Sequence, residues 1–185
     1  MRALVFAVFL ACASAAAGAE PIELTTIDGE VSRPLDSGEG KFAAVIFITT
    51  DCPIANAYVP EMNRLAAHAK EQGGKLTLIH VDFDLTAEAA KSHRDDYDIE
   101  APVVIDRAHE IVKATKAEIT PEVVLLKPDG AVIYKGKIND LYVDFGDRRR
   151  EATQHYLRDA MTAISAGKTI DVRFIEAVGC FIPTK

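Results

Sequence analysis

The sequence predicts an α/β fold in which a central mixed β-sheet is flanked by helices, with a β-hairpin at its N-terminal end. Short apolar runs of strand length alternate with segments whose apolar residues recur at helical spacing, as expected of a sheet covered by helices. A Pro-Asp-Gly turn at 128–130 joins two late strands into a hairpin, so the sheet is mixed rather than wholly parallel. The chain has 185 residues, of which 49% are hydrophobic, and this suits one domain with a proper core.

The elements follow in order along the chain. The first hairpin is predicted at 22–27 and 31–35, because Asp28-Gly29 is a hairpin turn sequence. The continuous apolar run Ala43–Ile48 predicts a strand buried on both faces. A helix capped by Thr86 is predicted to end near Tyr97. The other predicted strands are 76–83, 101–105, 123–126 and 131–136, and the other predicted helices are 57–70, 109–115 and 151–165.

The N-terminus has the features of a signal peptide. Arg2 precedes an apolar stretch at 3–13 that is too short to span a membrane, and Ala17-Gly18-Ala19 supplies small residues for cleavage. We therefore expect a signal peptide at 1–19 and a mature domain at 20–185, whose residues 168–185 form a C-terminal tail. Leu10-Ala11-Cys12 partly resembles a lipobox, but ordinary cleavage is preferred because the cysteine lies so early.

Export to the bacterial periplasm or the outside of the cell is the expected localisation. The formal net charge of −7 argues against a general affinity for nucleic acid or anionic membranes.

Cys52 lies where a buried strand is expected to give way to a helix. Pro53 suits the first helical position, because its missing N–H is not needed there. The free N–H groups and the dipole at a helix N-terminus stabilise a thiolate, and cysteines so placed can have a pKa of about 3.5–7.5 instead of about 8.5. The sequence therefore indicates a reactive thiol. The alternative is a buried, inert cysteine.

Cys180 is the other cysteine that remains after cleavage. Export implies an oxidising compartment in which two cysteines can pair, provided that their Cα atoms approach to within about 7 Å. The sequence does not reveal the path of the tail. Cys180 could be a redox partner of Cys52, its partner in a structural disulfide, or a free thiol.

The order of elements, with Cys52 after the first long strand and Thr120-Pro121 before a later one, resembles the thioredoxin-like redoxin superfamily. More narrowly, it is similar to an uncharacterised exported branch of the alkyl hydroperoxide reductase and thiol-specific antioxidant-like proteins. The resemblance covers about 22–165. It implies a thioredoxin-like fold in which Pro121 follows a cis peptide bond and packs beside the reactive cysteine. A proline that simply begins a strand is the alternative.

Two family motifs match only in part. Ala55 stands where thioredoxins have their second cysteine, so the CxxC pair is absent. Thr49 and Cys52 match the threonine and cysteine of the peroxiredoxin motif, but Val45 stands at its proline position. Candidates for the peroxiredoxin arginine are identified by residue type alone; they are Arg107, Arg148 and Arg149.

The function predicted is thiol–disulfide exchange or peroxide reduction. Cys52 is the expected nucleophile and Cys180 the resolving cysteine, with Thr49 and Pro121 completing the site. The expected partners are a thiol or disulfide client protein, or a peroxide, together with an unknown reductant. No cofactor or metal is expected.

Two other classes stay open. One is a catalytically silent binding module of the same fold. The other is a copper-handling protein that uses Cys52 and Cys180. The five histidines lack HxxxH or HExxH spacing, so each is interpreted as a surface or packing residue. The aspartates at 82, 84, 95, 96 and 98 are interpreted as a solvated acidic surface.

Overall fold

The computed structural model describes residues 21–170 and 173–184. The predicted signal peptide at 1–19 therefore lies outside the described residues. The helices are α1 (Pro53–Glu71), α2 (Ala87–Asp96), α3 (Glu110–Thr115) and α4 (Tyr156–Ser165). The strands are β1 (Leu24–Thr25), β2 (Val31–Ser32), β3 (Ala43–Ile48), β4 (Lys75–His80), β5 (Val103–Ile105), β6 (Ile119–Thr120), β7 (Glu122–Leu126), β8 (Val132–Gly136), β9 (Tyr142–Asp144), β10 (Asp147–Arg148), β11 (Phe174–Ile175) and β12 (Cys180–Phe181).

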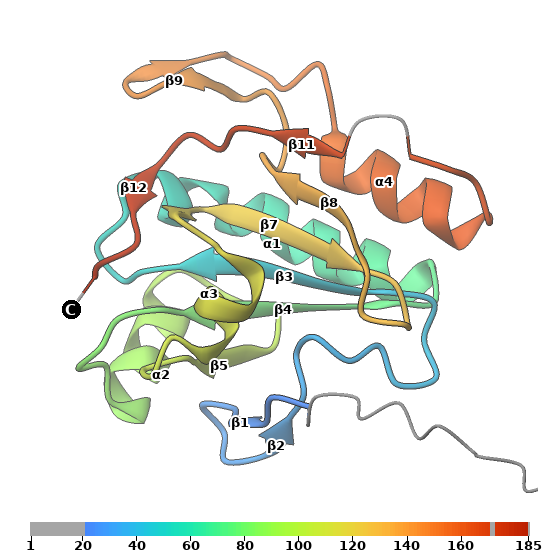
Figure 1. Ribbon diagram of the computed structural model, residues 1–185. Coiled ribbons are helices and arrows are strands. Elements are labelled where there is room, and N and C mark those ends of the chain that lie inside the picture. The colour runs from blue at the N-terminus through green and yellow to red at the C-terminus, as the bar shows by residue number, and fades with distance from the viewer. Residues whose placement is uncertain (1–20, 171–172, 185) are drawn as a thin grey trace, which may run out of the picture.

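Six strands form the central sheet in the order β11-β8-β7-β3-β4-β5 (Figure 1). β3, β4 and β5 run parallel to one another, whereas β7 is antiparallel to both β3 and β8. β1 and β2 form the predicted N-terminal hairpin. The expectation of a mixed sheet flanked by helices is confirmed.

The central strand β3 is buried along its whole length and divides its side chains between two cores. Ala44, Ile46 and Ile48 pack in the core that also holds the buried residues of α1 and α4. The alternate residues, Val45 and Phe47, pack on the other face with Ile111 of α3. Because neighbouring side chains of a strand point to opposite faces, an unbroken apolar run is what this doubly covered position requires.

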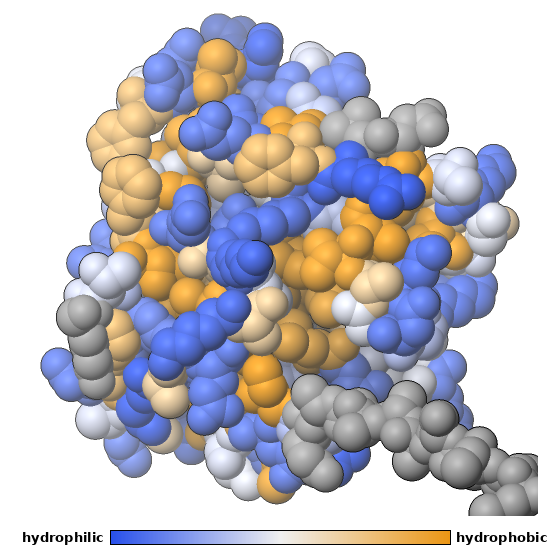
Figure 2. Space-filling model, viewed as in Figure 1, coloured by the Kyte–Doolittle hydropathy of each residue, from blue (hydrophilic) through white to orange (hydrophobic). Residues whose placement is uncertain are grey.

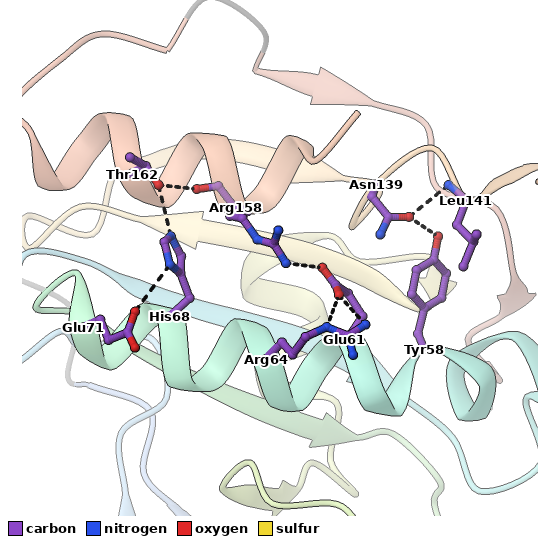
Figure 3. Close-up of polar contacts among 9 residues, drawn as sticks. All are labelled: Tyr58, Glu61, Arg64, His68, Glu71, Asn139, Leu141, Arg158 and Thr162. Carbon is purple, nitrogen blue, oxygen red and sulfur yellow. Dashed lines mark hydrogen bonds and ion pairs between the residues drawn. The ribbon is translucent and has the colours of Figure 1, made fainter. Parts of the chain in front are cut away.

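Polar contacts join α1 to α4 across the first of these cores (Figure 3). The Glu61 carboxylate accepts hydrogen bonds from Arg64 at 2.7 Å and from Arg158 at 3.0 Å. Seven residues further along α1, His68 Nε2 lies 3.0 Å from the Thr162 hydroxyl oxygen. These contacts hold α1 against the last helix.

α4 begins at Tyr156, five residues later than predicted. The Asp140 carboxylate accepts hydrogen bonds from the backbone N–H groups of Thr153 and Gln154 at 2.6 and 2.8 Å. Those N–H groups are thereby held in a loop before the helix. By contrast, α1 begins at Pro53, the proline expected at the first helical position, four residues before the range 57–70 that the apolar spacing predicted, and it continues through Pro60.

The segment 139–150, for which no strand was predicted, contains the hairpin β9–β10. The C-terminal tail forms two separate short strands. β11 pairs in parallel with β8, at the edge of the central sheet. Gly136 allows this approach, because a Cβ there would lie 1.7 Å from the Ile175 carbonyl oxygen. The tail is therefore attached to the sheet before it reaches β12.

Candidate active site around Cys52

Cys52 is the N-cap residue of α1 and is completely buried. Its sulfur accepts a hydrogen bond from the backbone N–H of Ala55 at 3.4 Å. The thiol donates to the Thr120 carbonyl oxygen, which lies 3.1 Å from the sulfur. Pro53 is the first residue of the helix, as expected. The sulfur thus lies at the positive end of a long helix and against the strand that precedes Pro121.

The Thr120–Pro121 peptide bond is cis, as the resemblance implied. Thr120 belongs to β6 and is completely buried. Pro121 lies between β6 and β7, so it follows directly on the carbonyl group that the Cys52 thiol contacts. The Thr120-Pro121 motif and Cys52 are therefore neighbours in space.

The C-terminal tail brings Cys180 to the same place. β12 runs antiparallel to β6, and Cys180 lies opposite Thr120 in the register. Burial, a hydrogen bond with the Cys52 side chain and the charges of Cys52 and Asp51 together raise the pKa of Cys180 to about 12. Both cysteines are free thiols in this structure. The two cysteines of the described chain are thus neighbours, both against Thr120, although 128 positions separate them in sequence.

The remaining candidates are less closely associated with Cys52. Thr49 is buried, and its hydroxyl oxygen has no hydrogen-bond partner among the described residues. The three arginine candidates are engaged elsewhere: Arg107 donates to the Leu85 carbonyl group at 2.7 Å, Arg148 lies over the Tyr142 ring, and Arg149 pairs with Asp140. No contact that we observe joins a described guanidinium group to Cys52.

A cluster that the sequence did not reveal borders the Cys52 turn. The Asp82 carboxylate accepts a hydrogen bond from the backbone N–H of Thr50 at 3.2 Å and contacts His80 Nδ1 at the same distance. His93 Nε2 lies 3.0 Å from the Asn56 side-chain oxygen. The rings of His80 and His93 meet edge to face, with centroids 5.0 Å apart.

The interpretation of Asp82 as a solvated surface residue is wrong, because it is hydrogen-bonded to Thr50 beside the site. The strand order accounts for the position of Asp82 beside the site. His80 ends β4, the parallel neighbour of β3, so the polar residues that follow these two strands meet at one edge of the sheet.

Acid is expected to destabilise the protein through His93. Burial, together with the nearby charge of His80, lowers the pKa of His93 from 6.5 to about 4, although Asp82 and Asp96 act in the opposite direction. The unfolded chain then binds more protons than the folded chain between these values, so stability falls as the pH drops from about 6.5 to 4. The loss is expected to reach about 2–3 kcal/mol.

Denaturant unfolding at several pH values measures this loss. The variant His93→Phe keeps a ring beside His80 but cannot titrate, so its unfolding free energy should change less between pH 7 and pH 4 than that of the unaltered protein. Parallel pH curves for the two proteins would contradict the assignment.

Within 21–170 and 173–184, no group of three or more His, Cys, Asp or Glu side chains could hold a metal ion. None of the described helices has the length and apolar character needed to cross a bilayer.

Comparison with known proteins decides the family. Residues 16–135 match the model of the AhpC/TSA family, which is well over half of the chain. The chain belongs to the AhpC/TSA family. The resemblance to thioredoxin-like redoxins is thereby confirmed.

Two curated relatives have the same name, thiol-disulfide oxidoreductase ResA. They come from Bacillus thuringiensis subsp. konkukian and Bacillus cereus ATCC 10987, and each is 32% identical over 135 residues. Each match covers 73% of this chain and 72% of the relative. These findings confirm the prediction of an oxidoreductase, and they support a redox function that depends on thiols.

Solved structures confirm the fold. An uncharacterised conserved protein from Geobacillus kaustophilus has a TM-score of 0.77 at 24% identity, and the match covers 90% of both chains. A hypothetical protein from Sinorhizobium meliloti 1021 has a TM-score of 0.75 at 22% identity, covering 89% of this chain and 91% of the other. A secreted disulfide oxidoreductase from Mycobacterium tuberculosis has a TM-score of 0.50 at 19% identity, covering 80% of this chain and 96% of the other.

Proposed function

We propose that this chain is an exported thiol–disulfide oxidoreductase in which Cys52 is the nucleophile and Cys180 is the resolving cysteine. The placement of both cysteines against Thr120, one at the N-terminus of α1 and the other on β12, is the observation that carries the proposal. The dithiol in this chain joins the helix start to the C-terminal tail. It replaces the CxxC pair that is absent because Ala55 is not a cysteine.

The reaction proceeds in two exchanges. The Cys52 thiolate attacks one sulfur of a client disulfide, so a bond forms between Cys52 and the client while the client's own disulfide breaks and releases a thiolate. Cys180 then attacks the Cys52 sulfur, forms the Cys52–Cys180 disulfide and releases the second client thiolate. The client gains two electrons and the protein dithiol loses two. A dithiol reductant restores the protein by the same exchange in reverse.

The environment of Cys180 suits this order of events. Burial is the largest cause of the raised pKa of Cys180, and the hydrogen bond with Cys52 and the charge of Cys52 raise it further. Both are lost when Cys52 is held in a mixed disulfide, so Cys180 then releases its proton more readily. Cys180 therefore stays protonated while Cys52 waits for a client, and becomes a better nucleophile once Cys52 has reacted.

Peroxide reduction is the second candidate. It is supported by the AhpC/TSA family and by Thr49, whose buried hydroxyl oxygen has no hydrogen-bond partner among the described residues. In that reaction Cys52 attacks a peroxide oxygen, the O–O bond breaks, hydroxide leaves and a sulfenic acid forms. Cys180 condenses with the sulfenic acid and releases water. The absence of a described guanidinium beside Cys52 favours disulfide exchange over this reaction.

A turnover assay distinguishes these functions. Reduced protein is mixed with insulin, or with hydrogen peroxide, in the presence of excess dithiothreitol, and loss of substrate is followed. We expect reduction of insulin disulfides well above the rate with dithiothreitol alone, and a smaller effect on peroxide. Faster consumption of peroxide than of disulfide would favour the second candidate.

Inactivity toward both substrates would favour the binding module. If the inactive dithiol retained Cu(I), the copper-handling alternative would be favoured instead. Export belongs to the proposal as well, and rests on the signal-like residues at 1–19. Detection of a mature chain beginning near Glu20 in a periplasmic extract checks it.

A further inference from the structure

The tail residues 178–183, here called the strap, lie along β6 like an added strand. Cys180 pairs with Thr120 and Phe181 with Ile119 in antiparallel register. Beyond the paired residues, the backbone N–H of Ile182 donates to the Glu118 carbonyl oxygen at 2.8 Å. The strap therefore binds β6 through main-chain hydrogen bonds, in the way an extended peptide adds to the edge of a sheet.

Positions 179 and 182 of the strap accept few side chains, whereas position 181 is unconstrained. A Cβ at residue 179 would lie 2.0 Å from the Thr120 carbonyl oxygen, so only glycine fits there. Ile182 is 6% exposed and packs with Ile111 and Ala117. Phe181, by contrast, is 82% exposed. The surface under the strap thus distinguishes a small residue before the cysteine and an aliphatic residue two positions after it.

The strap also decides what can reach the nucleophile. Cys52 is completely buried, with the Thr120 carbonyl group and Cys180 in contact with its side chain. A sulfur that attacks or is attacked by Cys52 must come close to its Sγ. A client cysteine can therefore reach Cys52 most directly by taking the place of Cys180 beside Thr120.

We propose that client polypeptides bind as an extended strand on β6 in place of the strap, and that the strap represents the sequence pattern the site accepts. This inference rests on the proposed exchange function. The pattern is a glycine, the reacting cysteine, any residue, and then an aliphatic residue. Without a client, the strap occupies the site. After a client cysteine has bonded to Cys52, the strap must return to β6 so that Cys180 can attack Cys52 and release the client.

The surroundings of the strap suit a client that is not fully folded. Four of the large hydrophobic side chains that the described protein exposes line one groove of about 790 Å³ beside the strap; they are Val143, Phe145, Phe174 and Phe181. Figure 2 shows pale-orange side chains gathered over β9, β11 and β12. Apolar segments next to a cysteine are exposed in unfolded chains and are buried in most folded ones.

A peptide with the sequence of residues 176–185 tests the proposal. Its cysteine is capped as a mixed disulfide with thionitrobenzoate, so attack by Cys52 joins the peptide to the protein and releases the coloured thiolate. The full chain is used as two variants. C180S keeps the strap in place without the competing thiol. G179V/C180S displaces the strap, because the added side chain collides with Thr120.

Peptide variants supply matched controls. With G179V/C180S, the unaltered peptide is expected to react at least about tenfold faster than peptides carrying Gly179→Val or Ile182→Asp, a difference of about 1.4 kcal/mol. A peptide carrying Phe181→Ser should react within about twofold of the unaltered one, because that side chain is exposed. C180S, with its strap seated, should react with the unaltered peptide at least about tenfold more slowly than G179V/C180S.

Failure of this inference differs from failure of the proposed function. Thionitrobenzoate-capped free cysteine measures the general reactivity of Cys52. If all peptides react at the rate of capped cysteine, the inference is overturned while exchange by Cys52 stands. If neither protein reacts with any capped thiol, both are overturned. Should G179V/C180S fail to fold, I182D/C180S loosens the strap at its buried anchor and takes its place in every comparison.

Discussion

Replacing Cys52 by serine is expected to reduce disulfide exchange by at least about 10³-fold, because a serine hydroxyl stays protonated at neutral pH and is a poor nucleophile. The fold should persist. The serine hydroxyl can still donate to the Thr120 carbonyl oxygen, which the Cys52 thiol contacts at 3.1 Å. The unfolding free energy should therefore change by no more than about 1.5 kcal/mol. Insulin reduction and denaturant unfolding measure the two effects.

The control for this variant lies outside the site. Thr162→Val removes a hydrogen bond between α4 and α1 at an exposed position, so its activity should stay near that of the unaltered protein. Substantial activity in a folded Cys52→Ser protein would contradict the assignment of the nucleophile.

Replacing Cys180 by serine is expected to halt the reaction at its midpoint. Cys52 can still attack a client disulfide, but no resolving thiol remains to release the client. Turnover should fall by about 10²-fold or more, while the first exchange proceeds and a covalent Cys52–client species accumulates. Intact-mass analysis after mixing with a disulfide-linked peptide detects this species, and excess dithiothreitol should release it.

The double variant C52S/C180S is the matched control, because it lacks both thiols and should acquire no added mass. Unaltered turnover by Cys180→Ser would show that the contact between the two thiols has no part in catalysis. The protein would then act through Cys52 alone, with an external thiol completing the cycle.

Local sequence patterns predicted the features that depend on nearby residues. The bounds of β3 were predicted correctly, because an unbroken run of six apolar residues suits only a strand covered on both faces. The cap of α2 at Thr86 was correct for a similar reason: its hydroxyl oxygen accepts from the N–H of Ala89 at 3.1 Å, a contact within one turn. The position of Cys52 at the start of α1 followed from the strand, the proline and the helix pattern together.

Features that depend on distant residues could not be predicted in the same way. The predicted start of α4 was wrong because Asp140, more than ten residues earlier, holds the preceding loop. The strap gives no strong signal in sequence, because its two paired residues gain their order from β6 rather than from any pattern of their own. His80, Asp82 and His93 likewise form a cluster only because parallel strands and α2 bring them together.

Disulfide mapping tests the central claim most directly. The reduced full chain is treated with a small excess of oxidised dithiothreitol or glutathione disulfide, alkylated, digested and analysed by mass spectrometry, with non-reduced and reduced samples in parallel. The proposed function predicts one intramolecular link, between Cys52 and Cys180, that forms in the folded protein and reopens fully with reduced dithiothreitol. Recovery of Cys52 and Cys180 as separate alkylated thiols or separate glutathione adducts, with no link between them, would contradict it.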